Sequence, residues 1–141
     1  MPANFTMVWE GVPIGKGRPR AFATKKGIRT YTPDKTVEFE ETLRYHMRRE
    51  MGVDELFQLP CRVEIEARFP IPKSYSKASR EIIDRGGSLP HTVKPDADNV
   101  LKAVMDAMNG IVFEDDKLAC DVRITKRYSR KPGLTVYVSE I

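Results

Sequence analysis

The segment 62–69 alternates strictly between apolar and charged residues, and this pattern constrains the fold more than any other feature. The two sets are Val63, Ile65, Ala67 and Phe69, and Arg62, Glu64, Glu66 and Arg68. Because successive side chains of a strand point to opposite faces, one face of this strand is buried and the other meets water. The segment therefore predicts a sheet that is covered on one side only.

Two helices are predicted from apolar residues at helical spacing. The first follows Thr32 as N-cap and Pro33 at the first position, and it ends at Gly52. Its apolar stripe consists of Phe39, Leu43 and Met47, with His46 beside them as a half-buried structural residue rather than a ligand. The second helix spans Asp98 to Met108 and stops at Asn109-Gly110. Its predicted buried face consists of Val100, Leu101, Val104, Met105 and Met108.

Further segments complete the order strand, helix, strand, helix, strand, strand. Strands are expected at 5–12, at 118–124 with Leu118, Cys120, Val122 and Ile124 inward, and at 134–138. A turn at 131–133 predicts that the last two strands pair antiparallel. A short helix is expected at 76–85, capped by Ser76 and stopped by Gly86-Gly87, and a connector follows at 88–95. The predicted class is α+β, a single domain over 1–141 with one mixed sheet and helices on one face.

Length and composition exclude several classes of protein. A chain of 141 residues fits one domain and has no apolar run near 18 residues, so no membrane contact is expected. The first six residues lack the pattern of a signal peptide. Cys61 and Cys120 show no metal-ligand spacing, and each is expected to be a small buried hydrophobe. A reducing cytoplasm is the simplest compartment.

The charge distribution indicates an anionic partner. The net charge is +4, and the stretch from Gly11 to Pro33 contains no acidic residue. Its basic residues are Lys16, Arg18, Arg20, Lys25, Lys26 and Arg29. A second basic cluster consists of Arg123, Lys126, Arg127, Arg130 and Lys131. Two basic clusters on either side of an acidic centre are typical of a polyanion track with a metal pocket, although two solvated loops would give the same pattern.

The acidic centre begins at Asp96 and Asp98, where a helix is predicted to start. In an extended segment this spacing puts both carboxylates on the same side of the chain. Lys102 follows one turn later, where it could bind a phosphate, stabilise the transition state or position a water. Asp115 and Asp116 precede a strand, and one of them could close the site. A hard cation such as Mg²⁺ takes oxygen ligands of this kind against a phosphate.

A purely structural interpretation of the same residues remains open. Asp98 suits an N-cap, and Asp96 suits the positive end of the helix dipole. Lys102 can pair with Asp98 or with Asp106, and the two later aspartates suit a turn.

Beyond these patterns, the chain resembles the RusA family of Holliday junction resolvases, which occurs in bacteria and their prophages. The resemblance is strongest in Lys94-Pro95-Asp96-x-Asp98-Asn99-x-x-Lys102, Asp106-Ala107-x-Asn109-Gly110 and Asp115-Asp116. The loop 15–20 and Tyr31-Thr32-Pro33 are similar to the Gram-positive and phage branch. The segment from Tyr75 to Thr92 is the least similar part.

The resemblance implies a Mg²⁺-dependent homodimer, with Mn²⁺ as a possible substitute, that cuts four-way DNA junctions with paired nicks. By position, the family's catalytic aspartates correspond to Asp96, Asp98 and Asp116, and its essential lysine corresponds to Lys102. Asp115 is a second-rank metal ligand. Contacts to the DNA backbone are expected from Lys16, Arg18, Arg20, Arg29, Lys126 and Arg127. Two alternatives stay open: a general metal-dependent phosphodiesterase, and a branched-DNA-binding protein without catalysis.

Overall fold

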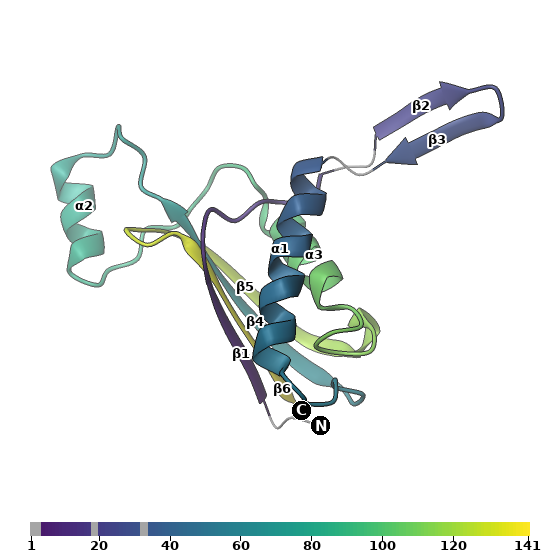
Figure 1. Cartoon of the computed structure of the whole chain (residues 1–141). Coiled ribbons are helices and arrows are strands. Elements are labelled where there is room, and N and C mark those ends of the chain that lie inside the picture. Colours follow the sequence, from purple (N-terminus) through teal and green to yellow (C-terminus); the bar gives the residue numbers. More distant parts are fainter. Residues whose placement is uncertain (1–3, 18–19, 32–33) are drawn as a thin grey trace.

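Four strands form a mixed sheet, and two long helices cover one of its faces (Figure 1). The computed structural model describes residues 4–17, 20–31 and 34–141. The strands are β1 (Asn4–Glu10), β2 (Arg20–Thr24), β3 (Gly27–Tyr31), β4 (Cys61–Pro70), β5 (Ala119–Ser129) and β6 (Gly133–Glu140). The helices are α1 (Asp34–Met51), α2 (Lys77–Asp84), α3 (Ala97–Met108) and the 3₁₀ turn η1 (Asp116–Leu118). The predicted α+β class, with a mixed sheet covered on one face, is confirmed.

The strand order of the sheet is β1-β6-β4-β5, which corrects the expected pairing of the last two strands. β6 pairs antiparallel with both β1 and β4, and β5 pairs in parallel with β4. β6 therefore has a neighbouring strand on each side. Its inward side chains Leu134, Val136 and Val138 are completely buried, which agrees with this inner position. The long crossover through α2 and α3 brings β5 back parallel to β4.

The core lies between the sheet and the two long helices. The predicted stripe of α1 is confirmed, because Phe39, Leu43 and Met47 are all buried. On α3 the buried set is Val100, Ala103, Val104, Ala107 and Met108, whereas Leu101 and Met105 are only partly covered. Arg44 of α1 donates to the carbonyl oxygens of Ala107 and Asn109 at 3.3 and 3.2 Å. A guanidinium at a helix C-terminus satisfies its free carbonyls and so fixes α3 against α1.

The two cysteines differ, and for Cys120 the prediction of burial is wrong. Cys61 on β4 is completely buried, as expected. Cys120 on β5 is exposed, and Val122 two residues later is 38% exposed. Both belong to the strand at the border of the sheet, where no strand from the described part of the chain pairs with the outer edge of β5. The helix-side face of β5 is therefore covered only in its later part, where Ile124 is partly buried and Tyr128 is buried.

Two peripheral pieces extend from this body (Figure 1). The basic segment after Lys16 forms the projecting hairpin β2–β3, in which Thr24 pairs with Gly27 around the Lys25-Lys26 turn. α2 is capped as predicted, because the Ser76 hydroxyl accepts from the Ser79 amide at 3.1 Å. The predicted helix start at Thr32 and Pro33 lies outside the described residues. None of the described helices is long and apolar enough to cross a membrane.

Candidate active site

Two carboxylates stand free at the start of α3. Asp96 is the N-cap residue, with extended backbone at φ −66° and ψ 152°, and Asp98 lies in the first turn. An N-cap aspartate ordinarily accepts a hydrogen bond from a helix amide. Within the described residues, Asp96 caps no amide, and neither carboxylate has a hydrogen-bond or ion-pair partner. The capping role is therefore not fulfilled by Asp96, and although both carboxylates suit the positive end of the helix dipole, they remain available to a ligand.

The glycine-rich loop 15–17 packs directly on this helix start. The Lys16 amide donates to the Asn99 carbonyl at 2.8 Å, and the Gly17 amide donates to the Thr36 hydroxyl at 3.0 Å. A Cβ at Gly15 would come within 2.7 Å of the Pro95 Cβ, closer than carbon atoms can approach. Glycine is therefore required at this position because the backbone itself fills the space beside the acidic segment.

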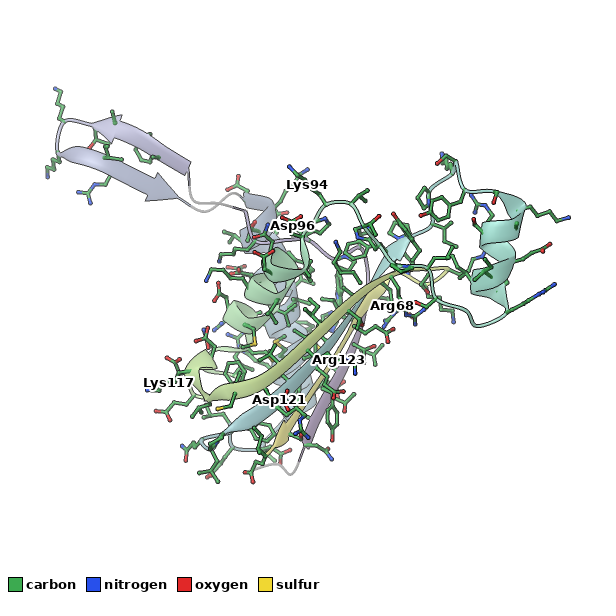
Figure 2. All side chains as sticks on the ribbon, turned by 180° about the vertical axis from the view of Figure 1, so that it is seen from behind. Arg68, Lys94, Asp96, Lys117, Asp121 and Arg123 are labelled. Carbon is green, nitrogen blue, oxygen red and sulfur yellow. The ribbon has the colours of Figure 1, made fainter. Side chains whose placement is uncertain are left out.

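A hollow of about 850 Å³ opens between this loop, the start of α1 and the start of α3. Its lining includes the carboxylate-bearing Asp96 and three basic residues: Lys16, Lys35 and Lys94. Figure 2 shows Lys94 and Asp96 at the end of the body from which the β2–β3 hairpin projects. The exposed Lys35 and Lys94 beside a free carboxylate give a site that can hold an anion and a cation together.

Lys35 and the position of Lys94 were not foreseen as parts of this site. Lys94 lies within the acidic motif, two residues before Asp96, but it was assigned no role. Lys35 is an exposed lysine in the first turn of α1. No local pattern separates it from other exposed helical lysines. It reaches the hollow because α1 and α3 pack side by side.

Lys16 occupies a different role from the one predicted for it. Its ammonium lies 2.7 Å from a Glu40 carboxylate oxygen and 3.2 Å from an Asp106 oxygen, and its side chain is only 17% exposed. Burial acts to lower the pKa of Lys16, but the hydrogen bonds to Glu40 and Asp106 outweigh it, so the pKa is raised. Lys16 thus ties the loop to α1 and α3, and a DNA contact from it remains a prediction.

Lys102 projects from α3 one turn after Asp98. Its nearest charged partner is Asp106, with 3.8 Å between the ammonium and the carboxylate oxygen, and its side chain is 64% exposed. An exposed pair at this distance is weak. The Lys102 ammonium is therefore free to turn toward a phosphate bound near Asp98.

Asp115 and Asp116 lie beyond the other end of α3. Asp115 is the N-cap of η1, and its carboxylate accepts from the Lys117 amide at 2.9 Å. This bond is the main reason why the pKa of Asp115 is lowered. Lys117 is the residue after Asp116, and Figure 2 shows it well away from Asp96, beyond the other end of α3. Among the described residues, no three His, Cys, Asp or Glu side chains gather in a group suited to a metal.

The remaining predicted DNA contacts lie in three different settings. Arg127 is paired with Glu66 at 2.7 Å on the open face of the sheet, and Lys126 donates to the Val93 carbonyl at 2.9 Å. Arg29 is exposed on β3. Arg20 begins β2, although its side chain is not described, and Arg18 lies outside the described residues. Among the members of this set whose side chains are described, Arg29 presents its charge most openly to a polyanion.

The donor chemistry of the helix start fits a hard divalent cation. Asp96 and Asp98 offer carboxylate oxygens, with no sulfur or imidazole ligand from the lining of the hollow. Mg²⁺ is commonly held by one or two carboxylates, with water and substrate phosphate completing its coordination. The two free aspartates meet that minimum without Asp116, whose part in metal binding stays a prediction.

Together, the mixed sheet covered on one face and the start of α3 place carboxylates and lysine side chains side by side on one surface. Comparison with known proteins identifies the group to which this protein belongs. The family model described as "Endodeoxyribonuclease RusA" matches residues 10–139, and the chain belongs to this family. It is also 29% identical over 133 residues to the uncharacterized protein YqaN of Bacillus subtilis (strain 168), covering 93% of this chain and 92% of that protein.

Proposed function

We propose that this protein is a Mg²⁺-dependent endodeoxyribonuclease that resolves four-way DNA junctions by paired, symmetric nicks, acting as a homodimer in a bacterial or phage-infected cytoplasm. The observation that carries the proposal is Asp96, an N-cap carboxylate that caps nothing within the described residues and borders a lysine-lined hollow. Membership of the RusA endodeoxyribonuclease family supports the reaction class. A two-fold dimer matches the symmetry of a four-way junction, which needs two coordinated cuts.

In this proposal Asp96 and Asp98 hold the metal, whereas Asp116 and the second-rank candidate Asp115 lie beyond the other end of α3 and are not needed for it. When bound, Mg²⁺ lowers the pKa of a water and neutralises charge that builds on the phosphate. Lys102 contacts the scissile phosphate or its leaving oxygen, because its ammonium is exposed one turn from Asp98. Lys94 and Lys35 line the hollow and bind the neighbouring phosphates.

The projecting hairpin supplies a second contact to the DNA. Lys25, Lys26 and Arg29 are exposed on it, and the stretch from Gly11 to Pro33 carries no acidic residue. Such an arm extends the positive surface away from the body (Figure 1), so it can follow a DNA arm while the helix start stays at the branch. Contacts of this kind position the substrate without reading its sequence.

The test compares a labelled four-way junction with a linear duplex of matching sequence, each with Mg²⁺ and with EDTA. Paired nicks in the junction alone, and only with Mg²⁺, support the proposal. Equal cutting of both substrates would indicate a general nuclease. Tight junction binding without cleavage under Mg²⁺ or Mn²⁺ would indicate a structural DNA-binding protein and overturn the catalytic assignment.

A further inference from the structure

The outer edge of β5 is open over its first half. β5 is a border strand whose partner within the sheet is β4. On the other side, the segment 89–91 reaches its later part: the His91 amide donates to the Lys126 carbonyl at 3.2 Å, and the Tyr128 amide donates to the Leu89 carbonyl at 3.0 Å. Backbone groups of a strand alternate between its two edges. The amides and carbonyls of Val122 and Ile124 therefore face the same outer edge, and no described residue pairs with them there.

An apolar strip borders this open edge. Val122 is 38% exposed, and Leu101 and Met105 of α3 are only partly covered. Asn99 and Asp106 mark the flank of α3 that faces the Lys16 loop and α1. By helical geometry, Leu101 and Met105 lie on the opposite flank, which is the flank toward the border of the sheet. Unpaired backbone beside exposed apolar side chains is a surface suited to strand addition.

We propose that this edge is the dimer interface, where β5 pairs antiparallel with β5 of a second copy about a two-fold axis at Val122. The two four-stranded sheets then form one continuous sheet, and the two α3 flanks meet over the joint. The inference rests on the homodimer of the proposed function and names its surface. An isologous interface requires a self-complementary patch, and the residues on either side of Val122 provide one.

Charge complementarity determines the register of this pairing. With the axis at Val122, Asp121 of each copy lies opposite Arg123 of the other, on the open face of the sheet. Figure 2 shows Asp121 and Arg123 following each other along β5. An axis at Arg123 would instead place two arginines directly opposite each other, which is destabilising. Asp121 already pairs with Arg62 at 2.8 Å, so it would bridge two guanidinium groups across the joint.

The test uses charge reversal and mixing, with mass measured by analytical ultracentrifugation and native mass spectrometry. Arg123→Asp places Asp opposite Asp, and Asp121→Arg places Arg opposite Arg, so each variant alone is expected to be monomeric. An equal mixture of the two variants restores opposite charges at both positions and is expected to form a one-to-one heterodimer. Arg85→Asp, an exposed charge reversal at the end of α2, is the control and stays dimeric.

Val122→Lys is a second variant, which keeps the pair between Arg62 and Asp121 intact. It is also expected to be monomeric, because a lysine on an edge strand blocks strand addition. Thermal melting checks that each variant is folded. A monomeric wild type, dimeric single variants, or a mixture that stays monomeric would overturn the interface. Junction cleavage by the same wild-type sample separates the two proposals: a monomer that nicks junctions overturns the interface and the homodimer but leaves the nuclease activity, whereas a β5-paired dimer that never cuts overturns only the nuclease.

Discussion

Replacing Lys16 with Met tests whether this lysine acts as an internal tie or as a DNA contact. The wild-type ammonium is shared by Glu40 and Asp106, at 2.7 and 3.2 Å. Methionine keeps the apolar stem but removes the charge, so two carboxylates face the same space without a counter-ion. We expect Lys16→Met to lower stability clearly, because uncompensated charges in a partly buried site are costly.

The size of the effect follows from the burial of the three side chains. They are 17%, 18% and 23% exposed, between a buried pair and a surface pair. Breaking a buried pair costs roughly 3–5 kcal/mol, and a surface pair contributes about 0–1 kcal/mol. A loss of about 2 kcal/mol is therefore expected, which for a chain of this length lowers Tm by roughly 6–8 °C.

Thermal and urea unfolding measure the stability, and binding of a four-way junction at several salt concentrations measures the DNA contact. Lys16→Met combined with Asp106→Asn should recover part of the lost stability, because only one carboxylate is then unpaired. Arg48→Met on the exposed end of α1 serves as the control. An unchanged Tm together with a salt slope reduced by about 1 would refute the internal tie and make Lys16 a phosphate contact.

Three further predictions concern the loop, the core and the hairpin. Gly15→Ala should slow junction cleavage and cost roughly 1–3 kcal/mol, because its Cβ would overlap Pro95; single-turnover rates and melting check this, and wild-type values for both would contradict the packing. His91 is buried against Phe69, with ring centroids 3.8 Å apart, and burial lowers its pKa from 6.5. The unfolded chain therefore takes up this proton first, so stability is full above about pH 6.5 and falls as the pH drops below it. The decrease in Tm from pH 7.5 to 5.5 should be smaller in His91→Gln, and equal decreases would exclude this origin. Lys25→Ala with Lys26→Ala should reduce the slope of log affinity against log salt by about 2 without moving the cut sites, whereas an unchanged slope would remove the hairpin from the DNA contact.

Local periodicity was enough to predict most elements, because the burial of a helix stripe or strand face is written into neighbouring residues. Phe39, Leu43 and Met47 show this for α1, and the alternation at 62–69 shows it for β4. The order of the strands is not local. β6 follows β5 after a short turn, yet it lies between β1 and β4. The exposure of Cys120 depends on that order, so its pattern alone predicted burial wrongly.

The candidate site divides in the same way. Asp96 and Asp98 were predicted together because the start of one helix fixes both positions. Lys16 meets Glu40 and Asp106 only after the loop, α1 and α3 have packed, so its basic surroundings in the sequence indicated a DNA contact instead. Lys35 enters the hollow through the same packing. Asp116 is separated from Asp98 by the length of α3. The sequence alone does not determine whether the segment after this helix returns to the helix start, so the distance between the two aspartates was not predictable.

The most direct test of the central claim is single-turnover cleavage of a four-way junction by wild type and by Asp98→Asn in Mg²⁺, with junction affinity measured on the same samples. Asp98 is exposed at the helix start, so the variant should fold and lose only about 0.3–1 kcal/mol of dipole interaction. We expect nearly unchanged junction affinity and a loss of cleavage greater than the roughly 10–100-fold effect of removing a residue behind a metal ligand. Cleavage by Asp98→Asn at the wild-type rate would contradict a metal-dependent nuclease centre at the start of α3.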